Sequence, residues 1–406
     1  MATDLVVTGM GVVSAIGQGK QPFTAALLAG SSAFGVMQRP GRRREDSPVL
    51  GAEIAALVVP DSIPKQVLRT ASLSATTALT VVQEAWDEAD LGQLDPHRVG
   101  MIVGGSNVQQ RELVNVHDSY RERIAFLRPT YALSFMDSDL CGFCTAHFGI
   151  QGLAYTVGGA SASGQLAVIQ AAQAVSSGQV DACIAVGALM DLSYWECQGF
   201  RAIGAMGSDR FAATPELACR PFDRDHDGFI YGECSGALVI ESLESSRRRA
   251  AKPYAALAGW GLAMDGNRNP DPSLQGETRA IRAALAHSGC AAAAIDYVNP
   301  HGTGSIVGDE TELGALRECG LGHVHLNATK SLVGHGLSAA GAVEIIATLL
   351  QMRAGRLHPT RNLDNPIDPY LRWVDPAGTS HQIENALTLS MGFGGMNTAL
   401  CWQRCP

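Results

Sequence analysis

Three polar residues stand in settings that suit reaction chemistry. Ser161 opens a long stretch of small apolar residues, where a serine either caps a helix or presents a nucleophile. His301 begins the run His-Gly-Thr-Gly, and His335 ends the run Lys-Ser-Leu-Val-Gly-His that starts at Lys330. A lone histidine is more often structural, but a neighbouring glycine lets the backbone approach a ligand closely. We therefore treat both histidines as candidate functional residues.

Apolar strands and buried helices alternate along the chain and must position these residues. Strand-like runs occupy residues 5–9, 99–105, 182–188 and 236–241, and helical patterns occupy residues 72–90, 163–177 and 339–352. Strands that are apolar on both faces indicate a sheet covered by helices, which predicts an α/β fold. A strand-like run at 254–259 begins a weak echo of the first half. We place a boundary near Ala250, giving halves 1–250 and 251–406 that pack as one unit.

Composition narrows the class of protein. Of 406 residues, 46% are hydrophobic and 17% charged, which is enough for a large core. The net charge of −9 argues against bulk binding of nucleic acid, and the basic runs 42–44 and 247–249 are interpreted as solvated charge. No apolar run reaches the length of a membrane span, and residues 1–7 lack signal-peptide features. We expect a soluble cytoplasmic protein with no membrane partner.

Two patterns resemble metal sites and are set aside. The ten cysteines include the pairs Cys141/Cys144 and Cys401/Cys405, but neither has the second pair or spaced histidines that zinc requires. Residues 223–228 resemble the start of a calcium loop, yet the position that needs a glutamate falls on Cys234. We expect reduced buried thiols and no metal.

Several motifs occur in the order typical of one enzyme family. They are residues 7–14 (VTGMGVVS), 220–223 (RPFD), 227–229 (DGF), 232–236 (GECSG), the two histidine runs, and 392–397 (GFGGMN). With them, the chain from residue 6 to about residue 400 resembles the β-ketoacyl synthases of the thiolase-like superfamily. The resemblance implies a five-layered αβαβα fold of two similar halves, and a homodimer. It also implies a substrate carried on the phosphopantetheine arm of an acyl carrier protein, with no cofactor.

Ser161 stands where this family keeps its reactive cysteine. A helix N-terminus lowers the pKa of a thiol, but serine gains little because its hydroxyl is a far weaker acid. The resemblance therefore implies that Ser161 marks the active site and loads acyl groups poorly. Gly158 and Gly159 depart from the family pattern. A one-residue shift of the alignment would place an alanine where the family has its cysteine. We therefore align the chain with the family through Ser163.

The resemblance assigns roles to the other motif residues. It implies that His301 and His335 donate hydrogen bonds to the thioester oxygen of a malonyl unit, each as a neutral ring. Lys330 takes a supporting role, paired with Glu344. The resemblance further implies that Thr303 and Ser305 contact the pantetheine arm, and that Phe393 and Gly394 form an aromatic gate and its turn. It implies an oxyanion hole formed by the N–H groups of Phe393 and Ser161. It also implies that Lys65, Arg69 and Arg210 contact the carrier protein.

A serine with both histidines intact is typical of the ketosynthase-like decarboxylases of polyketide β-branching cassettes. The resemblance therefore implies conversion of malonyl-carrier to acetyl-carrier. Two alternatives remain open: an acyltransferase or slow ketosynthase that forms an ester on Ser161, and a non-catalytic partner of a ketosynthase of the chain-length-factor type. The family's partner subunits generally lose the histidine motifs, which favours the decarboxylase.

Overall fold

The computed structural model describes residues 4–44 and 47–405. Twelve strands of the described chain form one continuous sheet. Eleven of them follow one another across the sheet, and the twelfth, β2 (Gly17–Gln18), pairs with β1 beside this path. In sheet order, the first half holds β6 (Ala154–Val157), β5 (Val99–Gly104), β7 (Ala182–Gly187), β9 (Cys234–Ser242) and β1 (Leu5–Ser14). The second half continues with β10 (Ala255–Met264), β17 (Met396–Arg404), β16 (Asn385–Gly392), β11 (Tyr297–Asn299), β12 (His325–Leu326) and β14 (Arg372–Trp373).

The two halves repeat one pattern of strand directions. In the first half β9 is antiparallel to both β1 and β7, and β5 is parallel to both β7 and β6. In the second half β17 is antiparallel to both β10 and β16, and β11 is parallel to both β16 and β12. The halves meet where Val6 pairs with Ala256. The sheet therefore consists of two equivalent units.

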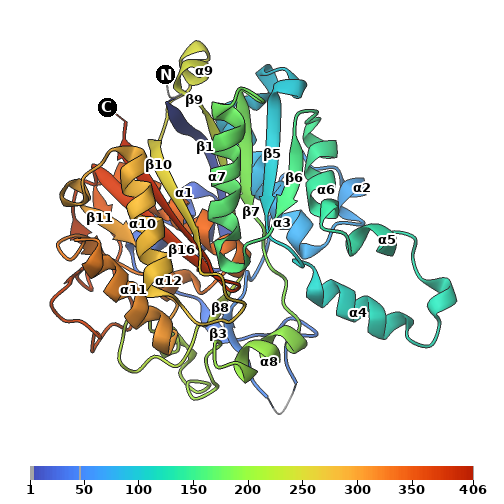
Figure 1. Ribbon diagram of the computed structural model, residues 1–406. Helices are drawn as coiled ribbons and strands as arrows, with labels where there is room; N and C mark the ends of the chain where they lie inside the picture. The colour runs from blue at the N-terminus through green and yellow to red at the C-terminus, as the bar shows by residue number, and fades with distance from the viewer. Residues whose placement is uncertain (1–3, 45–46, 406) are drawn as a thin grey trace.

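Helices form three layers around these sheet halves. The central helices α7 (Ser163–Ser176) and α13 (Ala340–Ala354) pack against strands of both halves and against each other. The outer helices are α3 (Leu73–Ala89) and α6 (Ser138–Phe148) on the first half, and α10 (Leu274–Ser288) and α11 (Ile306–Glu318) on the second. Figure 1 shows α10 and α11 on one side of the molecule and α6 on the other. This is the five-layered αβαβα arrangement.

The central helices are buried because their residues are small and apolar on nearly every side. Glycines let neighbouring backbones come close: a Cβ on Gly104 of β5 would lie 2.3 Å from the carbonyl oxygen of Ser163. Contrary to the expectation from the sequence, the segment Leu337–Ala354 is long and apolar enough to span a membrane, but 89% of it is buried inside the protein. It is therefore a core helix.

Strand β1 continues well past the expected end at Gly9, because its glycines serve packing. A Cβ on Gly11 would lie 2.0 Å from the carbonyl oxygen of Val81 in α3, so the helix lies directly against the strand. Strand β10 likewise extends beyond residue 259, to Met264. The helices predicted at 72–90, 163–177 and 339–352 correspond to α3, α7 and α13. Each predicted start and end lies within two residues of the observed one.

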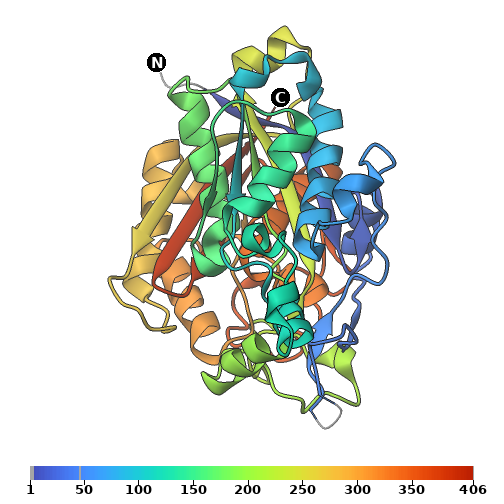
Figure 2. The same ribbon diagram turned by 90° about the vertical axis from the view of Figure 1, so that its right-hand side faces the viewer.

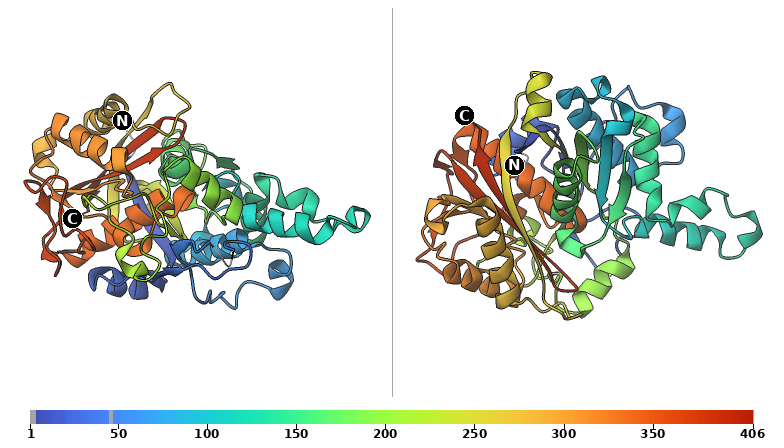
Figure 3. Two further views of the ribbon diagram at one scale, coloured as in Figure 1. Left: turned by 90° about the horizontal axis from the view of Figure 1, so that it is seen from below. Right: turned by 45° about the horizontal axis from the view of Figure 1, so that its top comes forward.

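Shorter elements complete the fold. The other helices are α1 (Lys20–Leu28), α2 (Lys65–Leu68), α4 (Gln110–Tyr120), α5 (Tyr131–Ser134), α8 (Tyr194–Ala202), α9 (Leu243–Arg248) and α12 (Lys330–Val333). The other strands are β3 (Phe34–Val36), β4 (Leu50–Ala52), β8 (Tyr231–Gly232), β13 (Arg356–Leu357) and β15 (Thr379–Ser380). Helices α4 and α5 form an arm that projects from the first half, seen end-on in Figure 2 and from the side in Figure 3.

Candidate active site

Ser161 lies in a sharp turn between β6 and the buried helix α7. It sits in the 3₁₀ turn η4 (Ala160–Ala162), and Ala160 before it has a left-handed backbone with φ of 47°. Its Oγ lies 3.0 Å from Nε2 of His335. Ser163 bonds the backbone of this turn instead, accepting from Gly159 N at 2.9 Å and donating to the carbonyl oxygen of Ala160 at 2.7 Å. Ser161 is thus directed to His335 and does not cap α7.

His335 is held as a hydrogen-bond donor by the backbone. Its Nδ1 accepts a hydrogen bond from the N–H of Leu337 at 3.3 Å. A neutral imidazole carries one proton, so this bond places the proton on Nε2. Nε2–H therefore donates to Ser161 Oγ. Leu337 has a left-handed φ of 51°, an uncommon conformation for a non-glycine residue, and this backbone turns its N–H toward the ring.

His301 reaches the same protonation by a different route. It follows β11, and Nζ of Lys330 lies 3.3 Å from its Nδ1. The Lys330 ammonium has three donors and no acceptor, and it bonds His301 Nδ1, the His301 carbonyl oxygen and Glu344. Nδ1 of His301 is therefore an acceptor, and its proton lies on Nε2. The Lys330–Glu344 pair implied by the resemblance is present and buried.

Burial keeps both rings neutral. It lowers the pKa of His301 well below the usual range, and the nearby charge of Lys330 lowers that pKa further. Burial and Lys330 likewise lower the pKa of His335. The two ring centroids are 5.4 Å apart, and both rings line one cavity of about 410 Å³ together with Ser161. The site thus holds two neutral N–H donors beside a hydroxyl.

Two carboxylates of α11, which the sequence reasoning missed, hold the loop that carries His301. Glu312 accepts hydrogen bonds from the N–H groups of His301 at 2.5 Å and Gly302 at 2.8 Å. Asp309 accepts from the N–H groups of Thr303 and Gly304, each at 3.1 Å. An acidic pair three residues apart, just after a glycine-rich loop, was the available signal. Burial raises the pKa of Glu312 to about 7.

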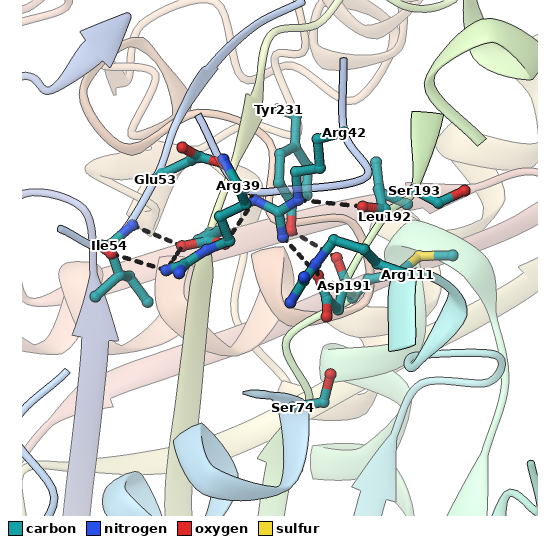
Figure 4. A network of polar contacts seen from close by, with 12 residues as sticks. Arg39, Arg42, Glu53, Ile54, Ser74, Arg111, Asp191, Leu192, Ser193 and Tyr231 are labelled. Atoms are coloured by element: carbon teal, nitrogen blue, oxygen red, sulfur yellow. Dashed lines mark hydrogen bonds and ion pairs between the residues drawn. The ribbon is translucent and has the colours of Figure 1, made fainter. Parts of the chain in front are cut away.

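A buried ion-pair network supports the other side of the site. The interpretation of Arg42 as solvated charge is wrong: Arg42 is fully buried and pairs with Asp191 at 2.6 Å and with Glu233 at 2.6 Å. Its guanidinium lies 5.3 Å from the ring centroid of Tyr231, whose hydroxyl donates to the carbonyl oxygen of Met190 at 2.6 Å. Figure 4 shows the Arg42 side chain beside Tyr231 and Asp191. This network fixes the position of strand β8. The N–H of Gly232 in this strand donates a hydrogen bond to the carbonyl oxygen of His335 at 3.1 Å.

Other predicted residues line the cavity. The Ser305 hydroxyl accepts from the N–H of Gly308 at 3.1 Å, and the Thr303 hydroxyl accepts from the N–H of Ser305 at 3.2 Å. Each hydroxyl keeps a proton to donate to a ligand. Phe393 is 40% exposed, and its ring centroid is 6.2 Å from that of Phe200. Gly394, predicted as part of this turn, is not among the lining residues, whereas Phe393 and Gly395 on either side of it are.

The basic residues predicted to meet a carrier protein do not line the cavity. Lys65 and Arg69 lie at the exposed helix α2, and Arg210 stacks on Phe211 at 4.6 Å and pairs with Asp227. Their carrier contacts stay predictions.

The patterns that resembled metal sites have other structural roles. Cys141 and Cys144 are buried free thiols. Burial raises the pKa of Cys141 to about 11. The Asp223 carboxylate accepts hydrogen bonds from the N–H groups of Asp225, Asp364 and Asn365, so it joins two segments of chain. Within residues 4–44 and 47–405, no group of three or more His, Cys, Asp or Glu could hold a metal ion.

The fold and this paired-histidine site define a class, and the chain belongs to the β-ketoacyl synthase family. Residues 2–246 match the N-terminal domain of that family, and residues 254–364 match its C-terminal domain. The chain is 61% identical over 400 residues to a Bacillus subtilis (strain 168) protein named polyketide biosynthesis malonyl-ACP decarboxylase PksF, covering 98% of this chain and 96% of that one.

More distant relatives carry the same fold. The chain is 31% identical to 3-oxoacyl-(acyl-carrier-protein) synthase 1 of Haemophilus influenzae, over 98% of each chain. The structure matches the crystal structure of a β-ketoacyl synthase from Burkholderia phymatum STM815 with a TM-score of 0.90, at 27% identity and over 100% of both chains.

Proposed function

We propose that this chain removes carbon dioxide from malonyl groups on an acyl carrier protein and leaves acetyl groups on the same carrier, in polyketide biosynthesis. One observation carries the proposal: both imidazoles that line the cavity have Nδ1 occupied as an acceptor, so both present Nε2–H. Two fixed donors suit an oxygen that gains negative charge. The 61% identity to the B. subtilis decarboxylase supports the same reaction.

The geometry suggests how the reaction proceeds. When the substrate binds, its thioester oxygen accepts a hydrogen bond from Nε2 of His301 and, in place of Ser161 Oγ, one from Nε2 of His335. As the bond to the carboxylate breaks, its electron pair moves through the α-carbon to that oxygen and forms an enolate. Each preorganised donor stabilises this charge by about 3–4 kcal/mol. Phe229, which packs edge-on against His335 at 5.1 Å, and Phe393 give the leaving carboxylate an apolar surrounding.

The arrangement argues against a nucleophilic Ser161. A serine needs a base to accept its proton, and the ring nitrogen next to Ser161 Oγ already carries one. Neither His301 nor His335 has a free acceptor nitrogen. This disfavours the acyltransferase and slow-ketosynthase alternatives. The chain-length-factor alternative is disfavoured because both donors remain assembled in an open cavity.

The cavity mouth suits a carrier arm. Ile306 and Val307 at the start of α11 are 59% and 61% exposed and line the cavity beside the hydroxyls of Thr303 and Ser305. Apolar contacts and two hydroxyl donors match the alkyl and amide groups of pantetheine. The substrate brings this arm with it, so the proposed reaction requires no cofactor of the protein. The cytoplasmic location and the β-branching pathway stay predictions.

A second copy of the chain is the proposed partner at the edge of the sheet. Within the described chain, β6 pairs on one side only, and Tyr155 on it is 40% exposed. Phe135 and Met136 are each 49% exposed, and the carbonyl oxygen of Asp137 next to them accepts from Thr156 of β6 at 2.7 Å. An exposed apolar edge strand favours pairing. Sedimentation tests this proposal: a dimer supports it, and a monomer at micromolar concentration contradicts it.

The proposed activity can be tested with purified protein and malonyl-carrier. Intact-mass measurement should show conversion to acetyl-carrier with release of carbon dioxide. The matched control is the His301→Ala/His335→Ala double variant, which should leave malonyl-carrier largely unchanged. Stable malonyl-carrier in the presence of the wild-type protein would contradict the proposal.

A further inference from the structure

The cavity holds a carboxyl group that the steps above do not use. Glu277 lies in the first turn of α10, and its side chain is only 1% exposed. It lines the same cavity as Ser161, His301 and His335. Its Oε2 is buried and has no hydrogen-bond partner among the described residues. An unpartnered buried carboxyl oxygen is costly unless it carries a proton or meets a ligand.

The neighbours of Glu277 decide where the proton lies. Glu312 and Asp309 face it from α11, and Asp265 faces it from the end of β10. Glu312 uses both carboxyl oxygens to accept backbone N–H bonds, and these bonds lower its pKa against the larger effect of burial. Asp265 accepts from Asn397 at 2.9 Å and lies 4.0 Å from Arg279. Within the described chain, Glu277 alone among these four carboxyl groups has a buried oxygen without a hydrogen-bond partner, so it is the group that we expect to hold a proton.

Electrostatics agree with this assignment. Burial raises the pKa of Glu277 well above its usual range, and the charges of Glu312, Asp265 and Asp309 raise it further. Burial and these charges therefore favour the protonated form of Glu277.

The reaction needs an acid that the imidazoles cannot supply. Decarboxylation leaves an enolate whose α-carbon must gain one proton to become an acetyl methyl group. His301 and His335 are neutral, and a neutral imidazole is a very weak acid. We propose that Glu277 is the general acid that protonates the enolate carbon, directly or through one water in the cavity. This inference rests on the proposed function.

The step balances in protons and electrons. The enolate electron pair forms the new C–H bond, the proton comes from the Glu277 carboxyl, and the thioester carbonyl re-forms. The carboxylate left on Glu277 lies in the first turn of a fifteen-residue helix, where negative charge is favourable. Water that enters through the open mouth then returns the proton. The sum is one malonyl group and one proton converted to one acetyl group and carbon dioxide.

The first test compares Glu277→Gln with Glu310→Gln, a control on the exposed face of α11. The rate of acetyl-carrier formation should fall at least about 10²-fold in Glu277→Gln and stay unchanged in the control, since general acids contribute about 10²- to 10⁴-fold. Glutamine has the size of glutamate, and thermal melting checks that the variant folds. Wild-type rates in a folded Glu277→Gln protein would overturn the proposal.

The second test uses a readout that a structural role would not move. The wild-type rate should fall as pH rises through the pKa of Glu277, because the carboxylate has no proton to give. Glu277→Gln should lose this alkaline limb, and Glu277→Asp should restore part of the rate and the limb. A limb that persists in Glu277→Gln, or a wild-type rate that does not fall at alkaline pH, would overturn the proposal. Failure of the proposed function is distinct, because the wild type would then release no carbon dioxide.

Discussion

His301 and His335 are held in the same protonation state by different means. The Nδ1 atom of His301 faces a side chain, the ammonium of Lys330, whereas that of His335 faces a backbone N–H, that of Leu337. A side-chain partner can be removed by substitution, but a backbone partner stays in place. The donor role of His335 is therefore set by the backbone, whereas the donor role of His301 depends on the buried Lys330–Glu344 ion pair.

Deleting either donor should have the largest effect. His301→Ala and His335→Ala should each lower the rate of decarboxylation about 10²- to 10³-fold, the usual cost of losing one oxyanion donor. Single-turnover assays with malonyl-carrier measure this. If one variant keeps the wild-type rate, the enolate charge is not shared between the two rings.

Removing Lys330 should free the position of the proton on one ring only, that of His301. In Lys330→Met, Nδ1 of His301 loses its donor and the ring can adopt the other protonation state, which misdirects one donor. We expect a rate loss of about tenfold to a hundredfold, smaller than that of His301→Ala. Glu344 would be left buried and unpaired, so Lys330→Met/Glu344→Gln is the control for stability. Equal losses in His301→Ala and Lys330→Met/His301→Ala would show that Lys330 acts only through His301.

The pH dependence of stability should reflect both rings. Their folded-state pKa values are lowered, so below pH 6.5 the unfolded chain takes up protons that the folded protein does not. The contribution of these two rings to the free energy of unfolding should therefore fall as pH drops below 6.5. Glu312 and Glu344, whose pKa values are raised to about 7, give the opposite slope above pH 4.5. Denaturant titrations should show less acid loss in His301→Asn/His335→Asn than in the wild type.

Ser161 should matter least to decarboxylation. Ser161→Ala removes one neutral hydrogen bond from His335, worth about 1 kcal/mol, so the rate should change by no more than about tenfold. A nucleophile would cost far more, on the order of 10⁶-fold. An acyl adduct on Ser161 in intact-mass spectra would contradict this account. Ser161→Cys sharpens the test, because a gain of condensation would show that the rest of the synthase site is intact.

The sequence predicts the central helices and strands well, but it predicts the hydrogen bonds within the site poorly. Helix α7 could be predicted because its small apolar residues leave no solvent-facing side, and Gly178 follows it with φ of 74°. The contact between Ser161 and His335 spans 174 residues, so only the resemblance could bring them together. The tautomer of His335 depends on a backbone N–H, which no side-chain pattern reveals.

The acidic residues of the site were missed because of their apparent setting. Glu277, Asp309 and Glu312 lie on helices α10 and α11, where a carboxylate normally indicates a solvated face. Tertiary packing buries all three against the His301 loop and the cavity. The sequence alone does not contain this packing, so their role emerges only from the fold.

The most direct test of the account is ¹⁵N NMR of the imidazoles of His301 and His335, assigned by substituting each in turn. The account predicts that both rings are neutral with the proton on Nε2 from pH 6 to 8. In Lys330→Met, the signal of His301 should change while that of His335 stays the same. An imidazolium at pH 7, or a proton on Nδ1 of either ring in the wild type, would contradict the claim that two fixed donors bind the enolate.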